Sequence, residues 1–345
     1  MRLLIKLSFI VVSIAASGQT DYLKKVAQGI DSQEHLSGAL LVGQNGKIIY
    51  QEAFGQANYT FGSPNSVDSK FLIGSLTKQF TAMLVMQQVE IGNLNLDDKV
   101  TKYLQDFRKE TGDRITLRHL LTHTHGIQNA NQSERYKPMT KSEFIKKYCE
   151  TDLEFEPGTQ FKYSDIVGYY LLGAILEQIT RTEYDKLLVE KIFKPIGMQN
   201  TGYFKSEIIL SNLSTGYSQT DKGIRNAPYW DISQSFSAAG LYSTVNDLFL
   251  WDQALRTNKL VSEKTLKIIF SPYTDKIRYG FGWFINDPEI NGAKRILAGH
   301  TGGANGYRSQ IMRGLDDDLV VIYLSNTDRY VELRYPVIDA VLTRQ

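Results

Sequence analysis

Hydrophobic runs near both ends of the chain predict β-strands. Residues 37–58, SGALLVGQNGKIIYQEAFGQAN, contain two apolar runs around Asn45-Gly46, a pair typical of a two-residue hairpin turn. Residues 295–326 contain three further strand-like runs, interrupted by the breaks GGANG and GLDDD. The last segment, YVELRYPVIDAVLTRQ, is typical of a terminal helix packed on a sheet. The two ends of the chain are therefore expected to build one sheet.

The middle of the chain has a helical pattern instead. Residues 77–94, TKQFTAMLVMQQVEIGNL, have the length of a buried helix that ends near Gly92. Apolar residues recur at helical spacing in 142–152, 168–193 and 246–257. This order predicts an α+β fold, in which an antiparallel sheet from both chain ends, with flanking helices, closes around a mainly helical insertion.

The predicted organisation is a single catalytic domain with two lobes. The domain comprises residues 19–345, with an α/β lobe over about 21–74 and 285–345 and a helical lobe over about 75–284. An active site is expected in the cleft between the lobes.

The N-terminus has the pattern of an export signal. Arg2 and Lys6 precede an apolar run from Leu7 to Ala16, and small residues follow. This pattern predicts a signal peptide over residues 1–18 with cleavage after Gly18, and a periplasmic or secreted protein. The alternative, a stable membrane anchor, is disfavoured because the apolar run is too short to cross a bilayer.

Composition narrows the classes of partner. Removing Arg2 and Lys6 from the 39 basic residues leaves 37, which equal the 37 acidic residues in number. No net charge attracts nucleic acid or an anionic membrane. A single cysteine excludes an internal disulfide, so stability must come from the core.

The stretch FLIGSLTKQF, residues 71–80, places a lysine three residues after a serine. On a helix these positions share a face, so Ser75 and Lys78 are expected to project together. Ser75 follows Gly74 at the expected helix start, where free N–H groups favour developing negative charge. A serine nucleophile needs a base, and burial in an apolar setting would favour the neutral amine of Lys78. The apolar neighbours are Phe71, Leu72, Phe80 and Met83. Taken alone, the motif is more often an ordinary helix start with a lysine whose ammonium reaches solvent, because S-x-x-K occurs by chance in many chains.

Two other stretches contain candidate chemistry. EPGTQFKYSDIVGYYLLG places Tyr163 between a Pro-Gly turn and a helix, where a phenol can relay protons. AGHTGGANG places His300, Thr301 and Gly302 at a predicted strand end, where small residues let a substrate backbone approach. Taken singly, these stretches are also typical of a core tyrosine and of a strand-to-turn transition.

In this order and spacing, the three stretches resemble the superfamily of serine β-lactamases and penicillin-binding proteins, for which S-x-x-K and K-T-G are signatures. The nearest resemblance is to the class C β-lactamase-like family, which includes D,D-peptidases, D-amino-acid peptidases and esterases. It extends from about residue 30 to about 330. Five supporting segments are LRHLLTHTHGI (117–127), FEPGTQFKYSD (155–165), IFKPIGMQNT (192–201), AAGLYSTVNDLFLW (238–251) and YGFGW (279–283).

The resemblance implies a role for each matching residue. Ser75 is the acylated nucleophile, and Lys78 and Tyr163 share the general base and acid duties. His300 stands where many relatives have lysine, and would orient the Tyr163 hydroxyl or meet a substrate carboxylate. The backbone N–H groups of Ser75 and Gly303 form the oxyanion hole. Thr301 and Gly302 bind the substrate backbone along their strand. No metal or organic cofactor is implied.

Two positions depart from the family pattern. Asp165 replaces the asparagine of Tyr-x-Asn; a carboxylate only accepts hydrogen bonds, whereas an amide also donates them. This substitution lowers the expectation of β-lactam or peptide hydrolysis and leaves ester hydrolysis open. His125 replaces a serine and, with His119 and His123, gives H-x-x-x-H-x-H. A zinc site there is disfavoured because the segment has no acidic ligand and matches a structural loop of the family.

The sequence therefore predicts a secreted serine hydrolase that acts through an acyl-enzyme on an amide or ester of a small molecule or short peptide. The activity is expected to be of the D,D-peptidase, D-aminopeptidase or esterase type. The alternatives are a β-lactamase, or a catalytically silent module that binds cell-wall peptide. The silent module is kept as an alternative because Asp165 departs from the family pattern.

Overall fold

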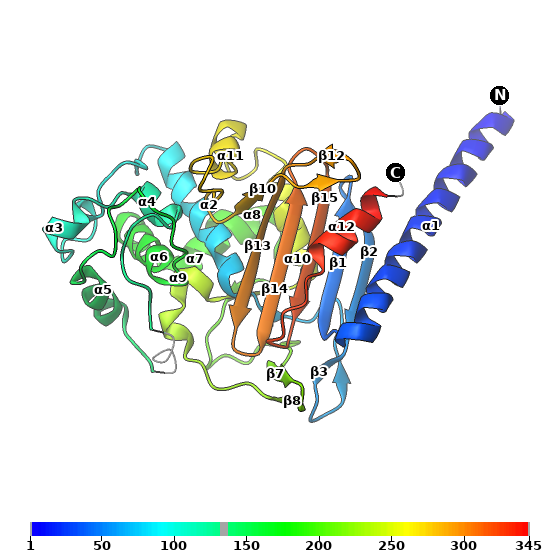
Figure 1. Cartoon of the computed structure of the whole chain (residues 1–345), viewed down its shortest axis with the longest axis horizontal. Coiled ribbons are helices and arrows are strands. Elements are labelled where there is room, and N and C mark those ends of the chain that lie inside the picture. The colour runs from blue at the N-terminus through cyan, green and yellow to red at the C-terminus, as the bar shows by residue number, and fades with distance from the viewer. Residues whose placement is uncertain (1, 132–136, 344–345) are drawn as a thin grey trace.

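A six-stranded antiparallel sheet forms the centre of the molecule (Figure 1). The computed structural model describes the backbone of residues 2–131 and 137–343, and the side chains in those ranges from Gly18 onward. In spatial order the strands are β10 (Phe284–Asn286), β13 (Leu297–Ala304), β14 (Tyr307–Gly314), β15 (Leu319–Ser325), β1 (Gly38–Gln44) and β2 (Lys47–Phe54). Strands from the two ends of the chain meet where β1 pairs with β15, so the predicted α+β class and sheet composition are confirmed.

Helices cover both faces of this sheet. They are α1 (Arg2–Glu34), α2 (Thr77–Glu90), α3 (Lys109–Gly112), α4 (Leu117–Leu121), α5 (Lys141–Cys149), α6 (Val167–Thr180), α7 (Tyr184–Leu188), α8 (Lys194–Ile196), α9 (Phe236–Ala239), α10 (Val245–Ala254), α11 (Glu263–Ile269) and α12 (Arg334–Leu342). Short helical turns are η1 (Gly74–Leu76), η2 (Val100–Lys102), η4 (Val189–Phe193) and η5 (Ile232–Gln234). The division into lobes near residues 74 and 285 stays a prediction.

Four small sheets lie outside the central one. They are β3 (Gln56–Asn58) with β4 (Ser63–Pro64); β5 (Phe71–Leu72), β9 (Leu241–Ser243) and β6 (Gly202–Tyr203); β7 (Tyr217–Thr220) with β8 (Gly223–Asn226); and β11 (Glu289–Ile290) with β12 (Ala293–Lys294). β5 pairs with β9 immediately before Ser75, which ties the start of α2 to a distant part of the chain.

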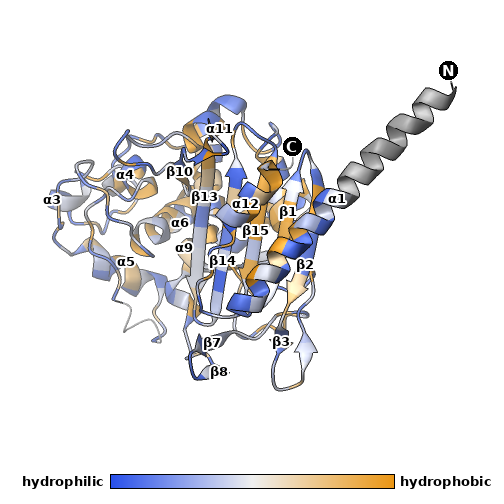
Figure 2. Cartoon of the chain, turned by 45° about the vertical axis from the view of Figure 1, so that its right-hand side comes forward, coloured by the Kyte–Doolittle hydropathy of each residue, from blue (hydrophilic) through white to orange (hydrophobic). Residues whose placement is uncertain are grey.

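The side chains of the inner strands β1, β13, β14 and β15 alternate between two cores. In β1, Leu41 belongs to the core under the inserted helices, while Leu40 and Val42 belong to the core beneath α1 and α12. Because both faces are buried, these strands are apolar along most of their length. Figure 2 shows hydrophobic residues along β1, β15 and α12.

Helix α1 packs on the second core through its C-terminal half. Leu23 and Ala27 are buried there beside α12. The signal peptide predicted for residues 1–18 consists almost entirely of residues whose side chains lie outside the described part of the structure. Among the described residues, no helix combines the length and apolar character that a membrane span requires.

Turn residues explain where the elements end. Asn45 and Gly46 both have positive φ, as the predicted two-residue hairpin requires. The helical pattern of 168–193 is not one helix, because Arg181 adopts a left-handed conformation and ends α6. Strand β13 continues through the glycines to Ala304, so His300 lies inside the strand and not at its end as expected.

The three histidines of H-x-x-x-H-x-H each hold a backbone amide. The Nδ1 atoms of His119, His123 and His125 accept hydrogen bonds from the N–H groups of Thr116, Ser164 and Ile127, at 3.3, 3.1 and 3.0 Å. Each ring is therefore used as an acceptor. Burial lowers the pKa of all three, to about 3 for His125.

These histidines make stability depend on pH. Their pKa values are lower in the folded than in the unfolded protein, so the unfolded chain binds more protons below about pH 6.5. The free energy of unfolding should therefore fall as pH decreases from about 6.5, by about 1.4 kcal/mol per pH unit for His125, whose pKa in the folded protein is about 3. Urea unfolding between pH 7 and 4 measures this slope.

His125→Asn keeps a hydrogen-bond acceptor at this position. It should reduce the pH dependence of the free energy of unfolding by the equivalent of about one bound proton, or about 1.4 kcal/mol per pH unit. The matched control is His35→Asn, at an exposed position with positive φ that asparagine tolerates. Equal slopes in both variants would contradict the assignment to His125.

Candidate active site

Ser75 and Lys78 lie side by side where η1 leads into α2. The Lys78 ammonium nitrogen Nζ is 3.0 Å from the Ser75 hydroxyl oxygen. Lys78 is completely buried, while Ser75 is partly exposed. The expectation that the two side chains project together is confirmed.

Two backbone carbonyls also accept hydrogen bonds from the lysine. Lys78 Nζ donates to the oxygens of Asp165 at 2.6 Å and Ala238 at 3.1 Å. A neutral amine has two N–H groups, which these carbonyls can accept, and one lone pair, which then points along the contact with Ser75. An ammonium group fills the same three positions as a donor. The position shared with the Ser75 hydroxyl is therefore where a proton can pass.

Tyr163 presents its phenol beside this pair. Lys78 Nζ lies 5.3 Å from the centre of the Tyr163 ring. Burial raises the pKa of the Tyr163 phenol, the nearby charge of Asp165 raises it further, and a hydrogen bond with Ser75 acts in the opposite direction. The phenol therefore keeps its proton at neutral pH and is available as a donor.

His300 is neutral and acts as a hydrogen-bond acceptor. Burial lowers the pKa of His300 to about 3, and the positive charge of Lys78 contributes to the same shift. Its Nδ1 is 2.6 Å from the carbonyl oxygen of Thr301, so Nδ1 carries the proton. Nε2 then accepts from the hydroxyl of Tyr279 at 3.1 Å and faces that of Tyr163 at 3.4 Å. An uncharged ring orients Tyr163 but offers no charge to a substrate carboxylate.

The strand that contains His300 has a free edge toward the serine. The edge strand β10 pairs with β13 only from Leu297 to Gly299. The N–H of Ile285 points away from β13, because it donates to Arg278, so Leu297 and Gly299 are the residues bonded to β10. By alternation the N–H of Gly303 faces the same side, beyond the end of β10.

Gly303 reaches Ser75 because glycines allow a close approach. Gly74 has φ of +50°, and a Cβ there would lie 2.6 Å from the nitrogen of Gly303. A Cβ on Gly302 would lie 2.1 Å from the carbonyl oxygen of Ile73, which accepts from the Ser309 hydroxyl. The backbone just before Ser75 thus lies against Gly303, which is the close approach that the predicted oxyanion hole needs.

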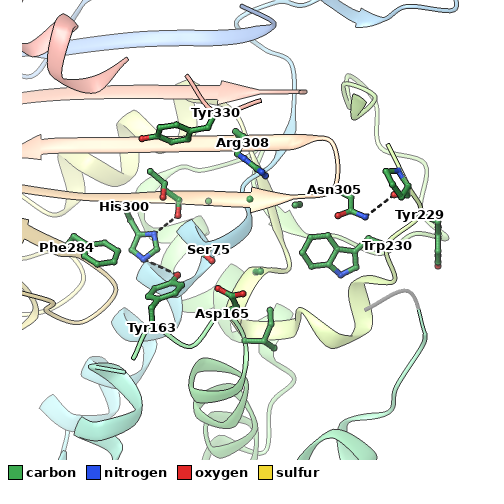
Figure 3. A pocket seen from close by; sticks show the side chains of 17 residues that line it. Ser75, Tyr163, Asp165, Tyr229, Trp230, Phe284, His300, Asn305, Arg308 and Tyr330 are labelled. Atoms are coloured by element: carbon green, nitrogen blue, oxygen red, sulfur yellow. Dashed lines mark hydrogen bonds between the residues drawn. The ribbon is translucent and has the colours of Figure 1, made fainter. Parts of the chain in front are cut away.

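A cavity of about 640 Å³ opens over these groups (Figure 3). Its wall includes Ser75, Tyr163, Asp165, His300, Thr301, Gly302 and Gly303. Lys78 lies beneath the wall, in contact with Ser75. The structure therefore brings together every residue predicted for the site. The catalytic role of each remains a prediction.

Several cavity residues were not anticipated as site residues. Tyr279 holds His300, and Trp230, Arg308 and Tyr330 line the cavity. Tyr279 lies in YGFGW, which the sequence analysis used only as a supporting segment. The hydrophobic pattern of the sequence does not single out Trp230, Arg308 or Tyr330. Trp230 and Tyr330 reach the cavity from loops, and Arg308 reaches it from β14, the strand next to β13. Among the described residues, no group of three or more histidine, cysteine or acidic side chains is arranged to hold a metal ion.

Comparisons with known proteins agree with this geometry. A model of the beta-lactamase family matches residues 23–342. Penicillin-binding protein 4* of Bacillus subtilis (strain 168) is 29% identical over 344 residues, which cover 92% of this chain and 74% of that protein. A penicillin-binding protein homologue from Pyrococcus abyssi, solved as an octamer, matches with a TM-score of 0.79 and 27% identity, covering 93% of this chain and 75% of that one.

A third relative is a named hydrolase. Teichoic acid D-alanine hydrolase of Staphylococcus aureus is 26% identical over 250 residues, covering 71% of this chain. The match spans 62% of that protein, less than two thirds of its length. Because the family model matches nearly the whole chain, and Ser75 lines the cavity with Lys78 against it, the protein belongs to the beta-lactamase family, within the superfamily of serine β-lactamases and penicillin-binding proteins.

Proposed function

We propose that this serine hydrolase acts through an acyl-enzyme on Ser75, with an ester or amide of a D-amino acid or short peptide as substrate. The observation that carries the proposal is the 3.0 Å contact between Ser75 Oγ and buried Lys78 Nζ, at the floor of a cavity that also contains the Gly303 edge.

The reaction begins with attack on the substrate carbonyl. Ser75 Oγ forms a bond to the carbonyl carbon while its proton passes to the neutral Lys78 amine. Negative charge develops on the carbonyl oxygen, where the N–H groups of Ser75 and Gly303 stabilise it. The bond to the leaving group then breaks, and the Tyr163 phenol supplies the proton that the leaving oxygen or nitrogen needs. Lys78 returns its proton to Tyr163.

Deacylation repeats these steps with water in place of the leaving group. The water loses a proton to the Tyr163–Lys78 pair and attacks the ester carbon of acyl-Ser75, and Ser75 Oγ takes that proton back. No step consumes an oxidant, reductant or metal. His300 holds the Tyr163 hydroxyl in place through Nε2 and stays neutral throughout.

The substrate class follows from the site and from the relatives together. One relative's name specifies D-alanine in a teichoic acid, and this supports a D-aminoacyl ester as substrate here. β-Lactamase activity is disfavoured because Asp165 cannot donate a hydrogen bond to an acylamido carbonyl as the family's asparagine can. A silent binding module has no chemical need for a buried lysine against Ser75.

Export through a signal peptide is part of the proposal. Cleavage after Gly18 keeps Leu23 and Ala27, which pack against α12, in the mature chain. If the protein is exported, N-terminal sequencing of the mature form should begin at Gln19. An intact N-terminus in the exported fraction would contradict cleavage.

The acyl-enzyme is tested by covalent labelling. A fluorophosphonate probe should add one mass increment on Ser75, and Ser75→Ala should abolish it. Lys78→Met should slow labelling by about 100-fold or more, because the hydroxyl loses its base. Ser211→Ala, at an exposed serine, is the matched control and should label normally. Absence of any adduct on the wild-type protein would favour the silent module.

Tyr163→Phe tests the proton donor. The variant should lose about 10²- to 10⁴-fold in kcat on an alkyl ester, whose leaving group needs a proton. The loss should be much smaller on a p-nitrophenyl ester, because p-nitrophenolate leaves without protonation. Equal losses on both esters would assign Tyr163 a structural role only.

A further inference from the structure

His123 lies behind the cavity wall and takes no part in the reaction steps proposed above. It is completely buried, in the turn that follows α4. The centre of its ring is 4.4 Å from that of Tyr163, 4.7 Å from that of Tyr279 and 5.3 Å from that of Tyr169. The imidazole is therefore in direct contact with the phenol ring that is proposed as the proton donor.

Two hydrogen bonds join His123 to the segment that contains this phenol. The backbone carbonyl of His123 accepts from the N–H of Lys162 at 3.0 Å, and its side-chain Nδ1 accepts from the N–H of Ser164 at 3.1 Å. The two bonds hold the backbone on either side of Tyr163. The first bond needs only a peptide group at position 123, whereas the second needs the imidazole or another acceptor in its place.

The bond from the side chain also lies next to the support of Lys78. Ser164 is followed by Asp165, whose carbonyl oxygen accepts from Lys78 Nζ at 2.6 Å. One imidazole nitrogen thus fixes the backbone between the phenol of Tyr163 and that carbonyl. If this backbone moved, the proton donor and the acceptor that directs the amine would move together.

The backbone conformation and the charge of His123 both fit such a role. Its φ is +56°, in the left-handed region where histidine, asparagine and aspartate are enriched. Burial holds the pKa of the imidazole well below its usual value, and the positive charge of Lys78 acts in the same direction. The ring is therefore neutral, and its proton is on Nε2 because Nδ1 accepts from Ser164.

The second ring nitrogen makes the imidazole costly at this position. Among the described residues, Nε2 of His123 has no hydrogen-bond partner. A buried donor without a partner lowers stability, a cost that an apolar ring of similar size would not have. The bond from Ser164 to Nδ1 is the contact that distinguishes histidine from such a ring.

We propose that His123 is a positioning residue, which holds the Tyr163 phenol and the Asp165 carbonyl in line with Ser75 through its bond to the Ser164 N–H. The inference rests on the proposed function, since it concerns the proton donor of that reaction. The imidazole contacts no substrate and exchanges no proton. It acts by fixing the backbone between these two groups.

The test compares two substitutions that both remove the ring. His123→Asn keeps an acceptor close to the place of Nδ1, and His123→Gly has none. Asparagine and glycine both tolerate the positive φ, so backbone strain does not separate the two variants. The values of kcat and KM are measured on an alkyl ester and on a p-nitrophenyl ester of the same acid.

We expect His123→Gly to lower kcat on the alkyl ester by about 10- to 100-fold, the scale of a displacement of about 1 Å at a reacting group. KM should change by less than about threefold, because the residues that line the cavity are unchanged. The loss of kcat should be about fivefold smaller, or less still, on the p-nitrophenyl ester, whose leaving group needs no proton. His123→Asn should recover most of the lost kcat on the alkyl ester.

His125→Gly is the matched control. His125 is also buried, and its Nδ1 also accepts from a backbone N–H, that of Ile127 at 3.0 Å, but this bond stays within its own loop. Urea unfolding should show a loss of stability in this variant too, while any loss of kcat should be equal on the two esters. If His123→Gly loses kcat equally on both esters, or if His123→Asn is as slow as His123→Gly, the positioning role is wrong.

A measurement on the wild type covers the case in which the variants fail to fold. Nitrogen NMR of isotopically labelled protein at neutral pH reports the tautomer of His123. We expect a protonated Nε2, and a scalar coupling between Nδ1 and the amide nitrogen of Ser164 across the hydrogen bond. A protonated Nδ1 would overturn the inference.

Failure of this inference can be distinguished from failure of the proposed function. If the wild type labels on Ser75 and hydrolyses both esters, any of the contrary outcomes above removes only the role of His123. If the wild type neither labels nor hydrolyses either ester, the proposed function itself is wrong.

Discussion

The site depends on a lysine amine that is completely excluded from water. Lys78 keeps its position because two backbone carbonyls, those of Asp165 and Ala238, accept its hydrogens. These carbonyls come from segments about 90 and 160 residues farther along the chain. Because they occupy two of the three directions around Nζ, the third is directed at Ser75. One set of contacts thus joins distant segments of the helical part and places the amine against the Ser75 hydroxyl.

The second constraint is the close approach of backbone to backbone between η1 and β13. Side chains at Gly74 or Gly302 would collide with main-chain atoms of the facing segment. Without side chains there, the oxyanion donors of Ser75 and Gly303 can meet. Since β10 stops at Phe284, opposite Gly299, the edge beyond it is left for a substrate. The glycines therefore allow the close backbone contact at the candidate site.

The two titratable side chains next to the Ser75–Lys78 pair, Tyr163 and His300, are both uncharged at neutral pH. His300 carries no charge at working pH, and the Tyr163 phenol keeps its proton. Among the described residues of the cavity wall, Asp165 and Arg308 are the charged side chains.

The sequence by itself determined the elements and the chemistry of the site. Strands at both ends, helices between them and the Ser75–Lys78 spacing all follow from local periodicity, which depends on near neighbours alone. The same local pattern misjudged the ends of elements, as at Arg181 and at His300, because a left-handed residue and a long strand pairing leave weak local signals.

Only the tertiary structure decided how these parts meet. It set the carbonyls that hold Lys78, the role of Tyr279 behind His300, and the entry of Arg308 and Trp230 into the cavity. These contacts join segments tens to hundreds of residues apart, and their geometry depends on how the sheet and helices pack. The spacing of residues along the sequence does not predict which distant side chains come into contact, so these contacts are known only from the folded structure.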